Sequence, residues 1–280
     1  MDGTGIIGIL IIIVNVLFSY KGFNNEQFFN AYKFQVDKIL VNKDYKRLVT
    51  SGFLHVSWAH LIFNMLSLLF FSTSIESYLG GFKFLIVYLV SLVGGDLFTL
   101  LVHRQHGDYN SVGASGAVCG VIFASIALFP GMEVGMLFIP LSIPGWIYGL
   151  LYVSYSIYGI KSRKGNIGHE AHLGGALVGM MVAVLMEPAA LLENYSTILI
   201  IAVPTIAFIY IIITKPHVLL IDNFFFKTHP KTYNIDQKYN LEKSRQQNEI
   251  DRILDKINKN GINSLSKSER EKLKEFSKKI

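Results

Sequence analysis

Three groups of polar residues stand at the starts of otherwise apolar stretches, and their side chains are suited to acyl-transfer chemistry. His60 and Asn64 lie four residues apart, Ser115 lies in the run GASG at 113–116, and His172 opens a further apolar stretch. A serine hydroxyl becomes a useful nucleophile when a base such as histidine removes its proton. The simplest assignment is a dyad with Ser115 as nucleophile and His172 as base, since no carboxylate is placed in the sequence to indicate a triad.

The apolar stretches are long enough to cross a lipid bilayer. The 280 residues are 51% hydrophobic and only 16% charged, and a bilayer core about 30 Å thick requires about 20 helical residues. Seven stretches approach that length: 5–20, 59–79, 82–102, 113–130, 142–160, 170–187 and 197–214. The sequence predicts an all-α membrane protein rather than a soluble one. We expect the first stretch to be a retained helix, because it has neither a basic leader nor a small-residue cleavage site.

The order of the stretches predicts that the three polar groups meet. If each of the first six stretches crosses the membrane once, the second, fourth and sixth begin at the same face. These are the stretches that start with His60, Ser115 and His172. Polar side chains within a span are costly and usually face the bundle interior. We therefore expect the three groups to converge at a similar depth.

Two series of small residues explain how the serine and the histidine could approach each other. Gly116 and Gly120 follow the serine, and Gly175 and Gly179 follow the histidine. Small residues at this four-residue spacing allow helices to pack backbone to backbone in lipid. Two facing glycine seams are expected to bring the serine hydroxyl within hydrogen-bonding distance of the imidazole.

An oxyanion formed by attack of the serine requires hydrogen-bond donors. Ser115 stands near the start of a predicted helix, where its backbone N–H lies in a favourable dipole. His60 and Asn64 share one helix face at their four-residue spacing and could supply side-chain donors.

Taken together, these motifs resemble those of the rhomboid family of intramembrane serine proteases. The matching residues run in order from about 45 to 187 and comprise Arg47, GFLH at 52–55, HLIFN at 60–64, GASG at 113–116, and AHLGG at 171–175 with Gly179. The resemblance implies a core of six membrane helices, here followed by a seventh at 197–214. It implies Ser115 as nucleophile, His172 as base, and His60 with Asn64 in the oxyanion hole. It also implies that Arg47 and Glu76 hold the loop after the first helix.

The sequence departs from this family at the position four residues after the nucleophile. Many relatives carry an aromatic residue there, which stacks on the catalytic histidine, whereas this chain has its single cysteine, Cys119. His172 would then be held by a smaller contact or from another helix. The position before Arg47, often Trp in relatives, is Lys46.

The function implied by the resemblance is that of a serine endopeptidase that cleaves transmembrane protein substrates in the bilayer. The implied location is a bacterial plasma membrane, crossed several times, with no cofactor, no metal and no nucleic-acid partner. A non-catalytic rhomboid-like binder of membrane proteins is one alternative. An ion or proton transporter that uses Asp96 and the histidines is another, although we expect Asp96 to bond a neighbouring hydroxyl or backbone group. A zinc site is a minor alternative, because His169 and His172 are three residues apart and the zinc motif HExxH needs four.

Two connecting segments carry their own expectations. The run at 137–144 contains two prolines and is expected to form a loop or broken turn. The aromatic-rich loop at 21–57 is expected to lie at the membrane interface.

The chain is expected to divide into a membrane domain, 1–214, and a polar, Lys-rich tail, 215–280. In the tail, apolar residues between 250 and 257 share one helix face, and Ser266 with Glu269 forms a capping box for a second helix. These features predict a helical hairpin at 248–279. A Phe-rich run at 223–226 is expected to be an interfacial anchor.

The cationic residues bear on orientation. All Lys and Arg except Lys83 fall in the tail or near the predicted face that carries the polar groups. The positive-inside rule places that face and the tail in the cytoplasm. The resemblance indicates the opposite orientation, because typical bacterial rhomboids open their site to the outside. Of the two, we favour the orientation with a cytoplasmic tail.

Overall fold

The computed structural model describes residues 5–136, 139–162 and 168–214, and in the tail residues 253, 256–257, 264–266, 268–271 and 273. The chain divides into two compact units, Met1–Phe225 and Phe226–Ile280. The predicted anchor at 223–226 and most of the predicted hairpin at 248–279 lie outside the described residues.

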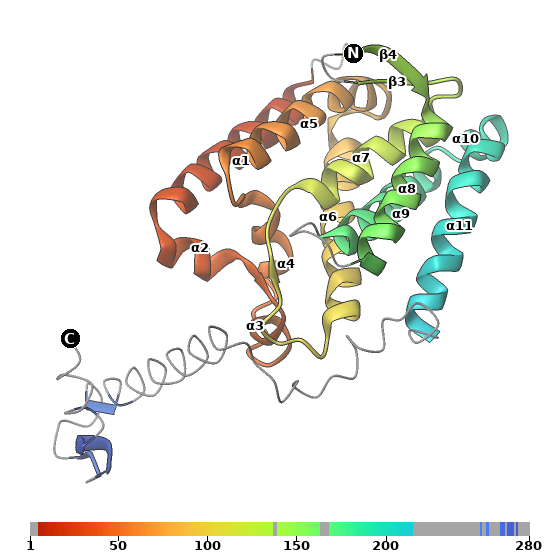
Figure 1. Cartoon of the computed structure of the whole chain (residues 1–280). Coiled ribbons are helices and arrows are strands. Elements are labelled where there is room, and N and C mark those ends of the chain that lie inside the picture. The colour runs from red at the N-terminus through yellow and green to blue at the C-terminus, as the bar shows by residue number, and fades with distance from the viewer. Residues whose placement is uncertain are drawn as a thin grey trace. The chain divides into compact units, whose positions relative to one another are not determined.

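The first unit is a bundle of helices that correspond to the predicted apolar stretches (Figure 1). They are α1 (Ile6–Asn24), α5 (Trp58–Leu79), α6 (Gly81–His103), α7 (Ser115–Leu128), α8 (Gly145–Ser162), α9 (His169–Met186) and α11 (Tyr195–Thr214). By length and composition, α1, α5, α6, α9 and α11 can cross a membrane, and α7 is a shorter apolar helix. The prediction of an all-α membrane protein is confirmed.

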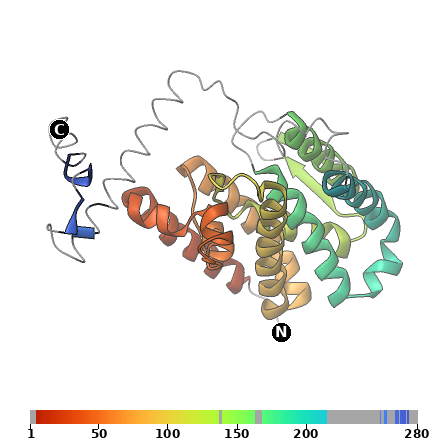
Figure 2. The same cartoon turned by 90° about the horizontal axis from the view of Figure 1, so that it is seen from below.

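Helix α7 occupies the middle of the bundle. It packs against α9, α6 and α5, and every residue from Gly116 to Leu128 is buried. Helix α1 lies on one side of the bundle and α11 on the other (Figures 1 and 2). At the far end of α7, the Asn194 amide donates to the carbonyls of Ile126 and Ala127 at 2.8 and 3.2 Å. Since the last carbonyls of a helix lack partners within it, this side chain closes the end of α7. Asn194 follows the short helix α10 (Ala189–Glu193).

The loop between α1 and α5 is folded rather than extended. It contains α2 (Glu26–Tyr32), β1 (Phe34–Gln35), α3 (Val36–Leu40), α4 (Arg47–Thr50) and the 3-10 helix η1 (Ser51–Phe53). Strand β1 pairs antiparallel with β2 (Asn110–Ser111), in the loop that leads from α6 into α7. The two loops of this face are therefore joined just ahead of Ser115.

Arg47 holds this loop as the family resemblance implied. Its Nη1 donates to the carbonyls of Asn30 and Lys33 at 3.0 and 2.6 Å, and its Nε donates to Asp44 at 2.9 Å. Arg47 is buried, and a buried guanidinium is stable only when its donors are paired in this way.

The implied role of Glu76 in the same loop is wrong. Glu76 lies near the opposite end of α5, and its carboxylate accepts from the backbone N–H groups of Ile7 and Gly8 at 3.0 and 2.9 Å. The first amides of a helix have no partner within it, and a negative charge is favourable there. Glu76 therefore caps the start of α1.

The segment before α8 forms a hairpin, so the prediction of a loop at 137–144 is wrong for residues 139–144. Strand β3 (Glu133–Met136) pairs antiparallel with β4 (Ile139–Pro144), with a register shift between Gly135 and Met136. A proline lacks an N–H and is tolerated at bulges and on edge strands, and both strands of this two-stranded sheet are edges. Pro144 is the last residue of its strand, and Pro140 lies where the register shifts.

The second unit has a small apolar cluster among its described residues. Ile253 and Leu265 are buried in it, with two partly buried aliphatic side chains against them. Ser266 and Glu269 exchange side-chain-to-backbone hydrogen bonds at 2.7 and 3.3 Å, which confirms the predicted capping box. Lys256 bonds the Glu269 carboxylate at 2.9 Å. The complete hairpin stays a prediction.

Candidate active site

Ser115 and His172 meet where α7 and α9 begin. Ser115 is the first residue of α7, and His172 lies in the first turn of α9. The distance from His172 Nε2 to Ser115 Oγ is 2.7 Å, and both residues are half-buried. The predicted approach of the two side chains is confirmed.

The glycine seams are the reason that α7 and α9 come so close. A Cβ placed on Gly175 would collide with the Gly116 carbonyl, and one on Gly179 would collide with the backbone of Gly120. The two helices therefore touch main chain to main chain, as the spacing predicted. Side chains wider than hydrogen would separate the helices and with them the serine and the histidine.

Helix α6 packs against α9 in the same manner. A Cβ on Gly95 would lie 2.5 Å from the Ala171 carbonyl oxygen, and one on Gly174 would lie 3.2 Å from Gly95 Cα. Sequence reasoning did not use the Gly94-Gly95 pair that precedes Asp96. The pair was nevertheless a signal for a second close helix contact.

Asp96 and Ser51 connect α6 to the backbone that precedes the serine. The Ser51 hydroxyl donates to Asp96 Oδ2 at 2.8 Å, which confirms the expected hydroxyl partner. The Ser51 carbonyl accepts from the Gly113 N–H at 3.0 Å. Gly113 has a φ of 137°, and a Cβ there would lie 2.8 Å from the His60 ring, so this position requires glycine.

His55 is a second support for the same backbone. Its Nε2 accepts from the Ala114 N–H at 3.4 Å, and its Nδ1 lies 2.8 Å from the Ser19 hydroxyl, which donates to the Phe53 carbonyl. Because Nε2 accepts, the ring is neutral with its proton on Nδ1. Burial, and secondarily the proximity of His60, lowers the pKa of His55 to about 3. Sequence reasoning missed this positioning role of His55.

The two predicted oxyanion donors, His60 and Asn64, differ in how readily their side chains could reach an oxyanion at Ser115. The His60 ring borders Gly113, which also faces Ser115 Oγ. The Asn64 side chain is buried and donates to the His60 carbonyl at 2.9 Å. His60 is thus next to the serine, whereas Asn64 would have to turn its amide away from its own helix to reach an oxyanion.

The contact that holds His172 comes from another helix. The Tyr152 hydroxyl, on α8, lies 3.0 Å from His172 Nδ1 and 2.9 Å from the Cys119 sulfur. Of the two expectations for a chain with cysteine at position 119, the one involving another helix is correct. Sequence reasoning missed Tyr152, although Tyr148, Tyr152 and Tyr155 follow one face of α8.

His169 and Glu170 of the run HEAH at 169–172 contact α8 and α6, and the His169 ring also lies 6.1 Å from the His172 ring. His169 lies against Gly159 of α8, and the Glu170 carboxylate accepts from His103 Nε2 at 3.2 Å. The His103 ring stacks on Tyr109 at 3.6 Å between centroids. In the described part of the chain, no group of three or more His, Cys, Asp or Glu side chains is placed to hold a metal ion. This geometry gives no support to the zinc alternative.

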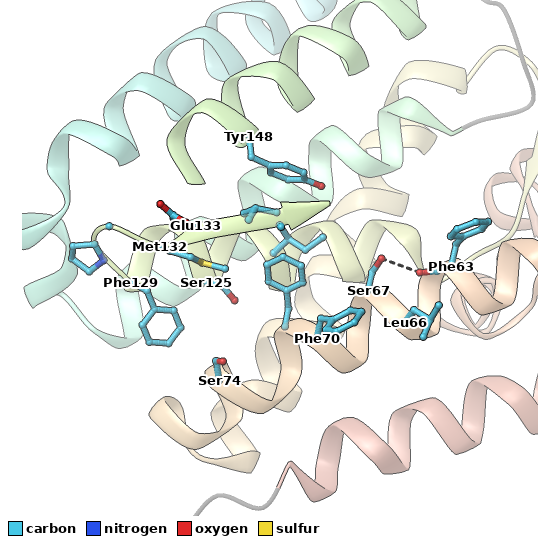
Figure 3. A pocket seen from close by; sticks show the side chains of 16 residues that line it. Phe63, Leu66, Ser67, Phe70, Ser74, Ser125, Phe129, Met132, Glu133 and Tyr148 are labelled. Atoms are coloured by element: carbon cyan, nitrogen blue, oxygen red, sulfur yellow. Dashed lines mark hydrogen bonds between the residues drawn. The ribbon is translucent and has the colours of Figure 1, made fainter. Parts of the chain in front are cut away.

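A cavity of about 1030 Å³ lies between α5, α7, α8 and the β3–β4 hairpin. Figure 3 shows phenylalanine side chains of α5 on one wall and Tyr148 on another. The α7 residues that line it, Ile122 and Ser125, are two or more turns beyond Ser115. Neither Ser115 nor His172 lines this cavity.

Two parts of the chain match known protein families. Residues 42–189 match the rhomboid domain, and residues 233–279 match a family of unknown function, DUF6576. RHOMBOID-like protein 12, mitochondrial, of Arabidopsis thaliana is 30% identical over 63% of this chain and 56% of its own. Rhomboid protein 1, mitochondrial, of Saccharomyces cerevisiae is 32% identical over 54% and 46%. The putative rhomboid protease YdcA of Bacillus subtilis is 30% identical over 52% and 69%.

The chain spans about half the length of the first two of these relatives. The rhomboid match covers more than half of the chain and includes His60, Asn64, Ser115 and His172. Together with the apolar helices, it shows that this is a multi-pass membrane protein and that the chain belongs to the rhomboid family.

Proposed function

We propose that this protein is an intramembrane serine endopeptidase in which Ser115 is the nucleophile and His172 the general base. The observation that carries this proposal is the 2.7 Å distance between Ser115 Oγ and His172 Nε2. A hydroxyl bonded to an imidazole acceptor can lose its proton as the oxygen attacks a carbonyl carbon. The similarity to the putative protease YdcA supports the same reading.

The reaction follows from these two groups. Ser115 Oγ attacks the scissile carbonyl as its proton passes to His172 Nε2, and the imidazolium then gives that proton to the leaving amine. Water, deprotonated by the same nitrogen, hydrolyses the acyl-enzyme. The backbone N–H of Ser115 and the His60 ring are the nearest candidates for stabilising the oxyanion.

The substrates that fit such a site are transmembrane proteins. A peptide bond within an intact helix is shielded by its neighbours, so a substrate segment rich in small or helix-destabilising residues would unwind more easily at the site. The likeness to the Bacillus subtilis protein favours a bacterial plasma membrane, and relatives named as mitochondrial make an organelle membrane the alternative.

The proposal is tested with a serine-reactive fluorophosphonate and a transmembrane substrate. We expect the wild type to be labelled and to cleave, and Ser115→Ala to do neither. Ser125→Ala is the matched control, because Ser125 is on the same helix and donates only to the Val121 carbonyl at 2.9 Å. Labelling of Ser115→Ala as strong as that of the wild type would disprove the assignment. A folded wild type that binds transmembrane peptides without labelling or cleaving them would favour the non-catalytic binder.

A further inference from the structure

Four side chains form one hydrogen-bonded network whose first and last members are on α7. Ser115 Oγ meets His172 Nε2 at 2.7 Å, His172 Nδ1 meets the Tyr152 hydroxyl at 3.0 Å, and that hydroxyl meets the Cys119 sulfur at 2.9 Å. Ser115 and Cys119 are one turn apart on α7, Tyr152 is on α8, and His172 is on α9. The network of hydrogen bonds thus links three helices through the imidazole.

The direction in which the protons point along this network decides whether Ser115 can react. A neutral imidazole carries one proton, so Nε2 can accept from the serine only if Nδ1 holds it. The Nδ1–H then donates to the Tyr152 oxygen, and the Tyr152 O–H points to the Cys119 sulfur. In the opposite direction, Tyr152 donates to Nδ1 and the proton on Nε2 points at Ser115, which cannot then give up its own.

Cys119 favours the productive direction because sulfur offers the tyrosine proton an acceptor. Cys119 is buried, so a Tyr152 proton turned away from His172 would have no water there and would lose a hydrogen bond without the sulfur. Sulfur is a weak acceptor, and we therefore expect a small effect from Cys119 and a larger one from Tyr152.

Packing holds the Tyr152 hydroxyl in place. The Tyr148 ring stacks on the Tyr152 ring with centroids 6.0 Å apart, and Phe123 meets it edge to face at 5.7 Å. The rings of Tyr152 and His172 are 6.3 Å apart at 33°. Tyr152 therefore acts on the imidazole through its hydroxyl rather than by stacking on its face.

We infer that Tyr152 is a positioning residue, whose hydroxyl keeps the proton of His172 on Nδ1 so that Nε2 can accept the proton of Ser115, with Cys119 as the acceptor that orients this hydroxyl. The inference rests on the proposed function and specifies how its base is held. It is the part that an acidic third residue plays in other serine hydrolases, taken here by a neutral hydroxyl.

Tyr152→Phe removes the hydroxyl and keeps the ring. We expect kcat for substrate cleavage, and the rate of fluorophosphonate labelling, to fall about tenfold to a hundredfold, the range seen when a hydrogen-bond partner that orients a metal-ligating histidine is removed, with KM unchanged. Tyr148→Phe is the control, since it removes a hydroxyl one turn earlier on α8 and leaves the bond to His172 intact. Labelling by Tyr152→Phe within about twofold of the control would overturn the inference.

The role of Cys119 is tested in the wild-type protein and in the Tyr152→Phe protein. Cys119→Ala is expected to slow labelling about twofold to fivefold, and Cys119→Ser to restore it, because a hydroxyl oxygen is also an acceptor. If Cys119 acts through Tyr152, Cys119→Ala should have no further effect in the Tyr152→Phe protein. An equal effect in both backgrounds would remove Cys119 from the inference.

A further measurement is made on the wild-type protein and uses a variant only to assign the signals. In protein labelled with ¹⁵N in its eight histidines, the His172 signals, assigned by their loss in His172→Ala, should show a protonated Nδ1 and an unprotonated Nε2. A protonated Nε2 in the neutral ring would overturn the inference even if the enzyme is active. A wild type that neither cleaves nor labels would instead count against the proposed function.

Discussion

Ser115 is held by close main-chain packing on one side and by hydrogen bonds on the other. On the side of α9, the contact is between main chains, because Gly116 and Gly175 leave no room for a side chain. On the side of the loops, the backbone ahead of Ser115 is held by hydrogen bonds that its N–H groups donate to the Ser51 carbonyl and to His55 Nε2. The helix side sets the distance between the serine and the histidine, and the loop side sets how α7 starts.

The two kinds of contact should fail differently. A main-chain contact contains no group that titrates and no side chain that can turn aside, so it tolerates no added atom. A hydrogen-bonded contact can be weakened gradually by pH or replaced by a side chain that makes the same bonds. Substitutions on the two sides of Ser115 should therefore differ in the size of their effect and in its dependence on pH.

Gly175→Ala is expected to be the most damaging of these changes. Its Cβ would collide with the Gly116 carbonyl oxygen and lie 2.7 Å from the carbonyl carbon, neither of which can move without shifting α7. We expect a loss of about 3 kcal/mol of unfolding free energy, the upper part of the range for an overpacked core. We also expect the fluorophosphonate labelling of Ser115 to be nearly abolished.

The control is Gly135→Ala in β3, where an added Cβ meets no atom within 4 Å. Its unfolding free energy in detergent should stay within about 0.5 kcal/mol of the wild type. If Gly175→Ala has the same unfolding free energy and the same rate of fluorophosphonate labelling as this control, the contact between glycines does not set the distance between Ser115 and His172.

The loop side should respond to pH through His55. Its pKa is about 3 in the folded protein, below its ordinary value of 6.5, so the unfolded chain takes up the proton first as pH falls. Stability is therefore complete above about pH 6.5 and declines from there toward pH 3. The slope from this one group is about 1.4 kcal/mol per pH unit, or about 2 kcal/mol lost at pH 5.

His55→Gln isolates this contribution from those of the other histidines. The glutamine carbonyl can accept from the Ala114 N–H in place of Nε2 but does not titrate. We expect unfolding of the variant to depend less steeply on pH between 6.5 and 3 than unfolding of the wild type. Equal slopes for the two proteins would show that His55 is not the group that titrates.

Asp96→Asn should have the smallest effect. The asparagine oxygen can still accept from the Ser51 hydroxyl, as Asp96 Oδ2 does at 2.8 Å. We expect a change of less than about 1 kcal/mol in stability and cleavage within about twofold of the wild type. The transporter alternative would be supported instead by two results together. The wild type would show no peptidase activity, and the ion or proton transport that it gives in vesicles would be lost in Asp96→Asn.

The sequence was most informative where one physical constraint dominates. Lipid requires long apolar helices, so the spans followed from hydropathy, and the close approach of α7 and α9 followed from glycine spacing. The meeting of Ser115 and His172 then followed from counting crossings.

What the sequence did not reveal depends on how helices and loops are turned toward each other. Tyr152 faces His172 only because of the rotation of α8, and no local pattern specifies that rotation. Glu76 bonds residues 68 and 69 positions earlier, and the bulge that admits Pro140 depends on the pairing of β4 with β3. His55 looked like an ordinary loop residue because its partners lie in α1 and ahead of α7.

The shortness of α7 has a consequence for depth and hydration. Its 14 residues rise about 21 Å, whereas the hydrocarbon core is about 30 Å thick. If the end closed by Asn194 reaches one boundary of that core, Ser115 lies about 9 Å inside the other. Hydrolysis at that depth needs a supply of water that lipid cannot provide. The folded loops around Arg47 and the β1–β2 pair lie just ahead of Ser115, so protein and not lipid alone borders the start of α7, on the side from which bulk water would reach a serine below the membrane surface.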